Sequence, residues 1–497
     1  MTADISFAIN TPMDTLKYTQ RFAMRINYRI KLIWACALVY LVTGCQPAYE
    51  LSQLQKIKQS DVLRVGILFN PTSYYVDTNG TAGFEHDLVN EFANYLDVEI
   101  ELIPSYHISE LLPKLENNQI DILVGGLTRT ESRSDKFRFS PPYLNISQKL
   151  VYKQGKQRPT KLSEVDGVIT VAPETSHLEI LEELKEDYPD LQFEVSKNAD
   201  PNELLEMIID GSVEFTIADS HNLSIVRRYF PDISVAFTLE KSRDLNWLLQ
   251  NNRDDSLYAI LIDFFGDMNE SGELIALEDR YFGHVEKFNY VDTRLFMKAV
   301  DQVLPTYQPW FEEYASGLDW RLLAAQSYQE SHWDPRAKSP TGVRGIMMLT
   351  QPTAKQLGVK SRLDAEDNIR GGAVYLQQLM RRVPDRISEH DRPWFALAAY
   401  NVGWGHVQDA RRLTSQLGGD PDKWVDVKQK LPLLRQKRYY KKTRYGFARG
   451  DEAVTYVSNI RRYYDTLVWL DQKATEEEIA ELRREEAQKP AIPEIAQ

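Results

Sequence analysis

The sequence predicts a multidomain protein, with a two-lobed α/β domain followed by a mainly α-helical domain. Strand-like and helix-like segments alternate from about residue 60, which is typical of a mostly parallel sheet. A similar alternating set recurs after residue 168, which favours two lobes in tandem. Beyond about residue 290 the strand-like runs stop, and helical periodicity continues to about residue 470. We therefore expect the α/β domain over residues 60–285 and the helical domain over residues 290–470.

The expected strands and helices alternate within both lobes of the first domain. In the first lobe, strands are expected at 62–67, 98–103 and 120–126, with helices at 84–95 and 108–115. In the second lobe, strands are expected at 168–171 and 213–218, with a helix at 178–184. Residues 475–497 are acidic at first and contain two prolines, and we expect them to form a solvated helix that frays into a disordered tail.

The composition is that of a folded protein and excludes some partners. The chain has 497 residues, of which 43% are hydrophobic and 26% charged, which suits several ordinary domains. Its net charge of −13 gives no overall positive field, so we expect no nucleic-acid partner. The two cysteines are Cys36 and Cys45, and none follows them. A thiolate metal site is excluded from the folded part, and we expect no metal and no cofactor.

The first 44 residues have the pattern of an export signal. Basic residues precede an apolar run at 32–42, and the small residues Thr43 and Gly44 come directly before Cys45. The apolar run is too short to span a bilayer comfortably. The arrangement resembles the lipobox of bacterial lipoproteins, which implies that Cys45 is acylated and becomes the first residue of the mature chain. The alternative is an N-terminal membrane anchor with an incidental cysteine.

We expect residues 1–44 to be the signal peptide and residues 45–59 to be a lipidated linker. Because Met24 begins a signal of ordinary length by itself, residues 1–23 are either part of the signal or an upstream start-site extension. In lipoproteins an Asp after the cysteine favours the inner membrane, whereas this chain has Gln46. The resemblance implies the periplasmic side of the outer membrane, with membrane contact through the lipid anchor only.

The chemistry is expected in the helical domain, at Glu330. Asp319 has the side chain of a helix N-cap, and Glu330 lies on the same helix side as Gln326. Pro335 ends the helix soon after Glu330, where the helix dipole and desolvation both raise the pKa of a carboxyl. A carboxylic acid that stays protonated near neutral pH can protonate a glycosidic oxygen. The alternative is a solvated, inert Glu330 at a frayed helix end.

Three motifs occur in order from Glu330 onward. They are the Glu330-Ser331 pair, the glycine-containing segment at 342–350 and the Ala-Ala-Tyr-Asn segment at 398–401, and Tyr456 follows in the last expected helix. The set resembles the lysozyme-like catalytic domain of lytic transglycosylases over roughly residues 300–470. Many members of that family have Gln where this chain has Met348. Its Met-Met-Leu-Thr sequence is similar to that of a membrane-bound subgroup.

The resemblance implies a role for each matching residue. Glu330 would be the catalytic acid and base, and a further set would bind substrate: Ser331, Gly345, Met347, Tyr400, Asn401 and Tyr456. Within this set, Tyr456 would steady Glu330 through its hydroxyl. The alternative role for Met347, Met348 and Tyr400 is packing in the core.

The expected reaction follows from the resemblance, because a single carboxylate does not by itself exclude hydrolysis. Retaining and inverting glycosidases use two, whereas the matching motifs contain one. The resemblance implies that peptidoglycan glycan strands are cleaved without water at the β-1,4 bond between MurNAc and GlcNAc. The C6 hydroxyl of MurNAc would attack C1 and leave a 1,6-anhydro end. A lysozyme-type hydrolase and a non-catalytic peptidoglycan-binding lipoprotein are the alternatives.

The first domain has a second set of motifs, at 83–88, 125–133 and 139–143. They resemble the periplasmic amino-acid-binding proteins of ABC transporters, which implies a ligand-binding domain that regulates the enzyme. The ligand residues that this implies are Tyr74 (or Tyr75), Thr128, Arg133, Ser176 (or Thr175) and Asp219. The guanidinium of Arg133 would hold the ligand's carboxylate and Asp219 its amine. The ligand is expected to be an amino acid or a peptidoglycan stem peptide, and the alternative is a domain that binds nothing.

A basic, tyrosine-containing stretch at 435–449 has no assigned role. Behind an export signal, contact with peptide-stem carboxylates or another anionic surface is one interpretation. A solvated loop is the other.

Overall fold

The computed structural model describes residues 51–77, 80–283, 290–339 and 342–488. The chain divides into two units, residues 1–56 and residues 57–497. The expected signal peptide and Cys45 lie outside the described residues. None of the helices in the described part is long and apolar enough to cross a membrane.

The first domain has an α/β fold in which short strands alternate with helices. Its strands are β1 (Val62–Leu68), β2 (Tyr75–Asp77), β3 (Gly80–Ala82), β4 (Glu99–Ser105), β5 (Ile122–Thr128), β6 (Phe137–Phe139), β7 (Leu144–Lys153), β8 (Ile169–Val171), β9 (Phe193–Val195), β10 (Phe215–Asp219) and β11 (Ile233–Gln250). Its helices are α2 (Gln53–Ser60), α3 (Phe84–Leu96), α4 (Ile108–Glu116), α5 (Glu131–Ser134), η1 (Leu162–Glu164), α6 (Ser176–Asp187), α7 (Pro201–Asp210), α8 (Ser220–Tyr229), α9 (Ser256–Glu270) and α10 (Glu273–Tyr281).

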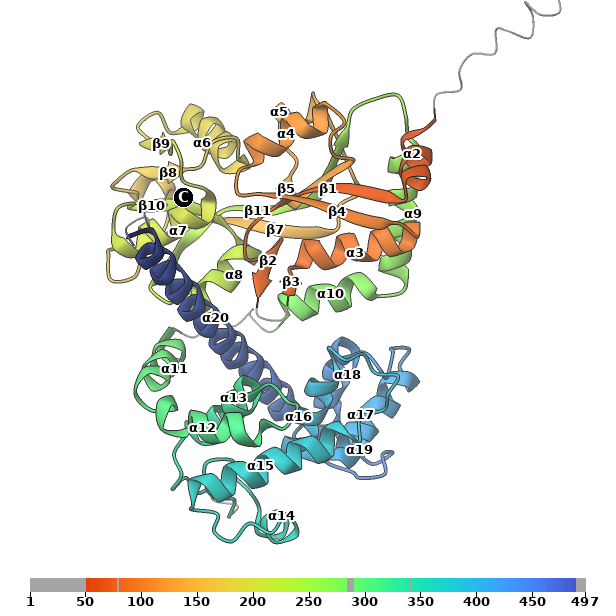
Figure 1. The fold of residues 1–497 in the computed structure, drawn as a ribbon, viewed down its shortest axis with the longest axis vertical. Helices are drawn as coiled ribbons and strands as arrows, with labels where there is room; N and C mark the ends of the chain where they lie inside the picture. The colour runs from red at the N-terminus through yellow and green to blue at the C-terminus, as the bar shows by residue number, and fades with distance from the viewer. Residues whose placement is uncertain (1–50, 78–79, 284–289, 340–341, 489–497) are drawn as a thin grey trace, which may run out of the picture. The chain divides into compact units, whose positions relative to one another are not determined.

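One sheet of the first domain runs through both lobes. Its strand order is β4-β1-β5-β11-β7-β10-β8-β9, with β6 paired to β11 (Figure 1). The long antiparallel strands β7 and β11 connect the lobes. Among the described strands of this sheet, parallel and antiparallel pairings occur four times each. The two-lobed α/β fold is confirmed, but the expectation of a mostly parallel sheet is wrong because it omitted β7 and β11.

A buried carboxyl joins three segments of the first lobe. Glu85 on α3 is 2% exposed. Its Oε1 accepts hydrogen bonds from the amide of Gly126 at 2.9 Å and from the hydroxyl of Tyr143, and its Oε2 accepts one from Nε1 of Trp247 at 2.9 Å. Aromatic side chains pack around this network, and Trp247 itself is fully buried. The network therefore fixes the end of β5 against β11, beside the junction of the lobes.

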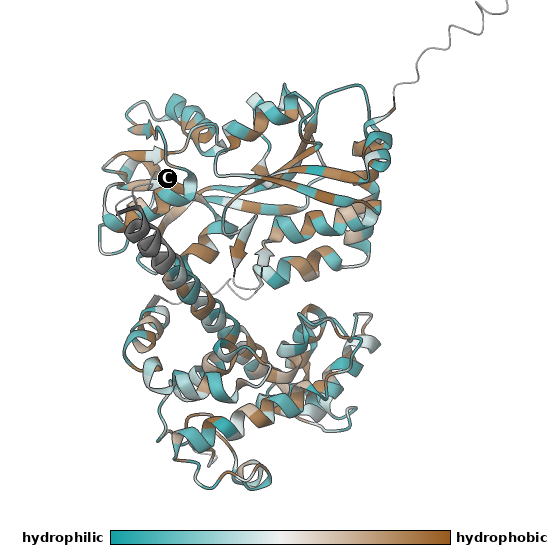
Figure 2. Cartoon of the chain, in the orientation of Figure 1, coloured by the Kyte–Doolittle hydropathy of each residue, from teal (hydrophilic) through white to brown (hydrophobic). Residues whose placement is uncertain are grey.

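The second domain is helical in its described part. Its elements are α11 (Tyr290–Gln302), α12 (Leu304–Ala315), α13 (Trp320–Ser331), α14 (Gln351–Gln356), α15 (Ala365–Met380), α16 (Arg392–Val402), α17 (Trp404–Gln416), α18 (Trp424–Lys430), η2 (Leu431–Arg435), α19 (Lys437–Tyr440) and α20 (Gly450–Gln488). Hydrophobic residues lie on the inward faces of these helices (Figure 2). In their core, Phe296, Tyr328 and Tyr463 form edge-to-face and tilted ring contacts that join α11, α13 and α20.

Helix α20 extends into the segment that was expected to be a helix fraying into a disordered tail. It continues to Gln488, which agrees with a helix at the start of that segment. Residues 476–488 are mostly Glu, Ala, Leu and Arg, which have high helix propensity. Residues 489–497 lie outside the described part of the chain.

Candidate active site

Glu330 lies in the last turn of α13, as predicted. The helix begins at the N-cap Asp319, whose carboxylate accepts the amide hydrogen of Arg321 at 2.9 Å. It ends at His332, which has a left-handed conformation with φ of 54°. Residues 322–328 of α13 are buried, whereas Glu330 is half-buried. The carboxyl is therefore anchored at the edge of the core, with part of its surface exposed.

The carboxyl of Glu330 has a tyrosine as its hydrogen-bond partner. The hydroxyl of Tyr456, on α20, donates to Oε1 of Glu330 at 2.6 Å. Desolvation raises the pKa of Glu330 to about 7, although the hydrogen bond from Tyr456 acts to lower it. Burial and the charge of Glu330 hold the pKa values of Tyr400 and Tyr456 well above their usual range, so both stay neutral. Glu330 is thus suited to donate a proton and to take one back near neutral pH.

A tight loop after α13 forms one side of the site. Asn368, which is fully buried on α15, accepts the amide hydrogen of Met347 at 2.8 Å and donates to the carbonyl of Arg362 at 3.0 Å. Gly345 has a φ of +86°, and a Cβ there would lie 1.9 Å from the carbonyl oxygen of Arg362. Only glycine fits between these backbone groups. The loop is therefore held closely against α15.

The other predicted substrate-binding residues lie at different depths. The hydroxyl of Ser331 donates to the carbonyl of Ile346 at 2.8 Å, and the hydroxyl of Tyr400 donates to the carbonyl of Met347 at 2.9 Å. Both residues thus fix the loop. Asn401 is exposed at the end of α16.

The side chain of Met347 does not lie where we expected it. It is fully buried in the hydrophobic core, so its backbone, and not its side chain, contributes to the site. The adjacent Met348 is only half-buried. The core-packing alternative therefore holds for Met347, and the reason is that this position faces Gly372 of α15.

The basic stretch at 435–449 is held by an acidic residue that the sequence analysis missed. Asp409 on α17 is fully buried, and its carboxylate accepts the amide hydrogens of Arg444 at 3.2 Å and Tyr445 at 2.7 Å. Tyr445 and Phe447 are about half exposed beyond this anchor. The segment is thus an anchored loop with exposed aromatic and basic side chains.

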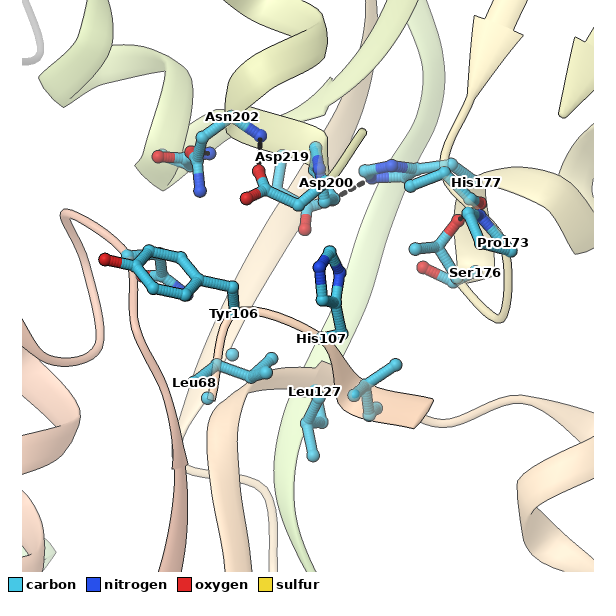
Figure 3. Close-up of a pocket in the computed structure, with 18 of the residues that line it drawn as sticks. Leu68, Tyr106, His107, Leu127, Pro173, Ser176, His177, Asp200, Asn202 and Asp219 are labelled. Carbon is cyan, nitrogen blue, oxygen red and sulfur yellow. Dashed lines mark hydrogen bonds and ion pairs between the residues drawn. The ribbon is translucent and has the colours of Figure 1, made fainter. Parts of the chain in front are cut away.

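The first domain contains a pocket of about 440 Å³ between its lobes. Tyr106 and His107 of the first lobe face Asp200, His177 and Asp219 of the second lobe across it (Figure 3). The predicted residues Thr128, Arg133, Ser176 and Asp219 also line this pocket. Tyr74 is not among the described lining residues, because it is buried against Phe69 and His86. Phe69 and Tyr106 supply the aromatic surface in its place.

Arg133 bridges the two lobes. Its guanidinium donates to the carbonyl of Thr128 at 3.1 Å and to the carbonyl of Glu174, in the second lobe, at 2.6 Å. These two bonds use only part of its five N–H donors. The side chain is buried and is part of the pocket lining.

Asp219 is paired with a histidine that the sequence analysis did not identify. Nε2 of His177 lies 3.1 Å from Oδ1 of Asp219, and Nε2 of Gln148 donates to the same oxygen at 3.1 Å. Burial acts to raise the pKa of Asp219, but His177, His221 and Gln148 together lower it. Asp219 is therefore a carboxylate that already has hydrogen-bond partners within the protein.

Two known protein families match different parts of the chain. Bacterial extracellular solute-binding proteins, family 3, match residues 63–284, and the transglycosylase SLT domain matches residues 310–422. The membrane-bound lytic murein transglycosylase F of Idiomarina loihiensis is 54% identical over 87% of this chain and 96% of that protein. Its counterpart of the same name in Pseudoalteromonas translucida is 51% identical over 90% of this chain and 95% of that protein. A crystal structure of an ArgBP mutant from T. maritima, at 23% identity and a TM-score of 0.42, covers 46% of this chain and 99% of that chain.

The close approach of Gly345 to the backbone of Arg362 can be tested by substitution. Gly345→Ala is expected to lower the melting temperature clearly, because the new Cβ would overlap the carbonyl of Arg362. Gly342→Ala is the matched control, since Gly342 has a similar φ of +85° but nothing within 4 Å of the added Cβ. We expect the control to cost only the left-handed backbone term of about 1–2 kcal/mol. Thermal unfolding followed by circular dichroism measures both, and equal shifts would contradict the close approach.

Proposed function

Because the chain belongs to the membrane-bound lytic murein transglycosylase F family, we propose that Glu330 is the acid and base of its reaction. The protein is a lyase that cleaves peptidoglycan glycan strands between MurNAc and GlcNAc without water and leaves 1,6-anhydroMurNAc ends. We further propose that residues 290–470 carry this activity and that residues 60–285 bind a ligand.

The proposed mechanism uses one carboxyl twice. Protonated Glu330 first gives its proton to the glycosidic oxygen, and the bond between that oxygen and C1 of MurNAc breaks. The Glu330 carboxylate then removes the proton from the C6 hydroxyl of MurNAc as O6 bonds to C1. The carboxyl is protonated again at the end, so protons balance and no water enters.

The observation that carries this proposal is the environment of Glu330. Desolvation raises its pKa to about 7, against the lowering effect of the Tyr456 hydrogen bond. A group with this pKa is partly protonated at neutral pH, so it can serve as an acid and then as a base. Two-carboxylate glycosidase mechanisms need a second acid close to the first, whereas the proposed mechanism uses Glu330 alone.

Glu330→Gln tests the proposed role directly. We expect a loss of at least about 10³-fold in the release of anhydro-muropeptides from purified peptidoglycan, measured by mass spectrometry. Glu312→Gln, an exposed change in the same domain, serves as the control and should keep full activity. Because the first step needs protonated Glu330, the wild-type rate should fall as the pH rises through about 7. Reducing ends in place of anhydro ends, or an active Glu330→Gln variant, would contradict the mechanism.

A second function, ligand binding in the first domain, is supported by the pocket that Arg133 and Asp219 share. We propose that Arg133 holds a carboxylate of an amino acid or stem peptide and that Thr128 and Ser176 add hydroxyl contacts. The contact between Asp219 and His177 affects how strongly Asp219 would bind an amine. An amine at Asp219 must compete with His177, so the carboxylate end is expected to contribute more to affinity.

Arg133→Lys tests the carboxylate site. Lysine keeps the charge but lacks the planar fork, so we expect at least about tenfold weaker binding of free amino acids or a stem tripeptide. Isothermal titration calorimetry on the purified protein measures this affinity. Arg129→Lys is the control, because Arg129 is exposed and outside the pocket lining. Binding that Arg133→Lys leaves unchanged would sink the proposed carboxylate contact.

The membrane-bound character of the family implies that the enzyme works at a membrane on the periplasmic side. We propose that the attachment is a lipid on Cys45 and that the membrane is the outer one. The small residues before Cys45 and the Gln46 after it support this proposal.

The anchor is tested by the mass of the N-terminal peptide of the mature protein. We expect it to begin at acylated Cys45, and we expect Cys45→Ser to abolish both cleavage and acylation. Cys36→Ser, within the expected signal, should leave processing unchanged. A mature protein that retains residues before an unmodified Cys45 would favour the plain membrane anchor instead.

A further inference from the structure

A buried glutamine lies directly behind the tyrosine that contacts Glu330. Gln326 is one turn before Glu330 on α13 and is fully buried. Its Nε2 donates to the hydroxyl oxygen of Tyr456 at 3.3 Å, and that hydroxyl donates to Oε1 of Glu330 at 2.6 Å. Three side chains therefore form one hydrogen-bonded chain from the core to the reacting carboxyl.

The direction of this chain follows from the donors and acceptors that each group has. The hydroxyl of Tyr456 carries a single hydrogen, and a carboxylate can only accept. When Glu330 is ionised, the hydrogen must therefore point to Glu330, which leaves a lone pair of the hydroxyl for the amide of Gln326. The amide nitrogen can only donate, so Gln326 stabilises this orientation of the Tyr456 hydroxyl and opposes the reverse one.

We propose that Gln326 is a positioning residue for the transglycosylase reaction, acting through Tyr456 to decide which oxygen of Glu330 carries the transferable proton. With the tyrosine hydrogen held on Oε1, the proton that Glu330 exchanges with substrate resides on Oε2. Without Gln326, the Tyr456 hydroxyl is free to turn, and a proton on Oε1 would be directed toward the tyrosine and away from the sugar. This inference rests on the proposed role of Glu330.

The other end of the same amide supports a functional role over a packing role. Oε1 of Gln326 is buried and has no hydrogen-bond partner within the described residues. An unpaired buried carbonyl destabilises the folded state. The neighbouring residues Leu322, Leu323 and Ala325 are apolar and buried, so the amide of Gln326 is a polar group in an apolar part of the helix. Its donor has a partner, the hydroxyl of Tyr456, and its acceptor has none among the described residues.

The hydrogen-bonded chain predicts that loss of Gln326 changes the pKa of Glu330. The titratable groups that face Glu330 are Tyr456 on α20 and Tyr400 on α16, and burial keeps both neutral. Loss of the Gln326 donor weakens the hydrogen bond that Tyr456 gives to the carboxylate. Because that bond stabilises the charged form, its weakening raises the pKa of Glu330 further.

The experiment compares Gln326→Met, Tyr456→Phe and the double variant in the full-length protein. Methionine has nearly the same length but cannot donate. We expect Gln326→Met to lower kcat roughly tenfold with KM unchanged, a minor part of the 10²–10⁴-fold that a positioned acid supplies. The alkaline limb of the pH profile of this variant should move to higher pH. Its melting temperature should be equal to or above that of the wild type. In the Tyr456→Phe background, Gln326→Met should change neither kcat nor the pH profile, because the hydroxyl that Gln326 contacts is absent.

Gln377→Met is the matched control. Gln377 is half-buried on α15 and donates only to backbone carbonyls, of Ala315 and Tyr314. This variant should lower the melting temperature and leave the pH profile in place.

A readout without turnover separates this inference from the proposed function. Carbon-13 NMR of glutamate-labelled protein titrates Glu330, whose signal is identified by its absence in Glu330→Gln. We expect its midpoint to rise in Gln326→Met, and to be the same in Tyr456→Phe and the double variant. Equal effects of Gln326→Met with and without Tyr456, or an unchanged midpoint and kcat, would overturn the positioning role. Activity in Glu330→Gln would instead overturn the proposed function.

Discussion

The hydrogen bond between Tyr456 and Glu330 is the interaction on which the catalytic domain depends. The two residues are 126 positions apart, and they meet because α20 packs along α13. Burial of a carboxyl is costly unless a donor is present, and one donor is supplied here. The aromatic contacts of Tyr328 and Tyr463 hold the two helices together below this bond. The fold thus keeps an acid whose charged and neutral forms are close in free energy.

Two buried glutamates in this chain show how the number of donors decides a role. Glu85 has both of its oxygens occupied by protein donors, and it joins β5, Tyr143 just before β7, and β11. Glu330 has a hydrogen bond from Tyr456 on Oε1 and is only half-buried. Burial raises the pKa of both carboxyls, yet only Glu330 offers an oxygen to another molecule. The same side chain is structural in one lobe and is the proposed acid and base in the helical domain.

Local patterns in the sequence predicted the local features of the structure well. The N-cap Asp319, the end of α13 and the position of Glu330 follow from residues within one or two turns of each other. Distant partners were not predictable in this way, because Asn368, Asp409 and His177 act on segments that only the fold brings to them. Strand β11 was missed for another reason, since its middle residues 240–244 are mostly charged or polar and interrupt the hydrophobic pattern. Tyr74 and Met347 had the right residue types, but packing turned both side chains into the core.

The order of the elements along the chain determines which contacts can form while the chain is being synthesised. Strand β11 lies between β5 and β7 in the sheet, so the first lobe is incomplete until residues 233–250 have been made. In the same way, a growing chain that ends before α20 contains Glu330 but lacks the tyrosine that tunes it. Long-range pairing of this kind delays the final structure until late in synthesis. The carboxyl of Glu330 therefore gains its hydrogen-bond partner only after α20 has been made.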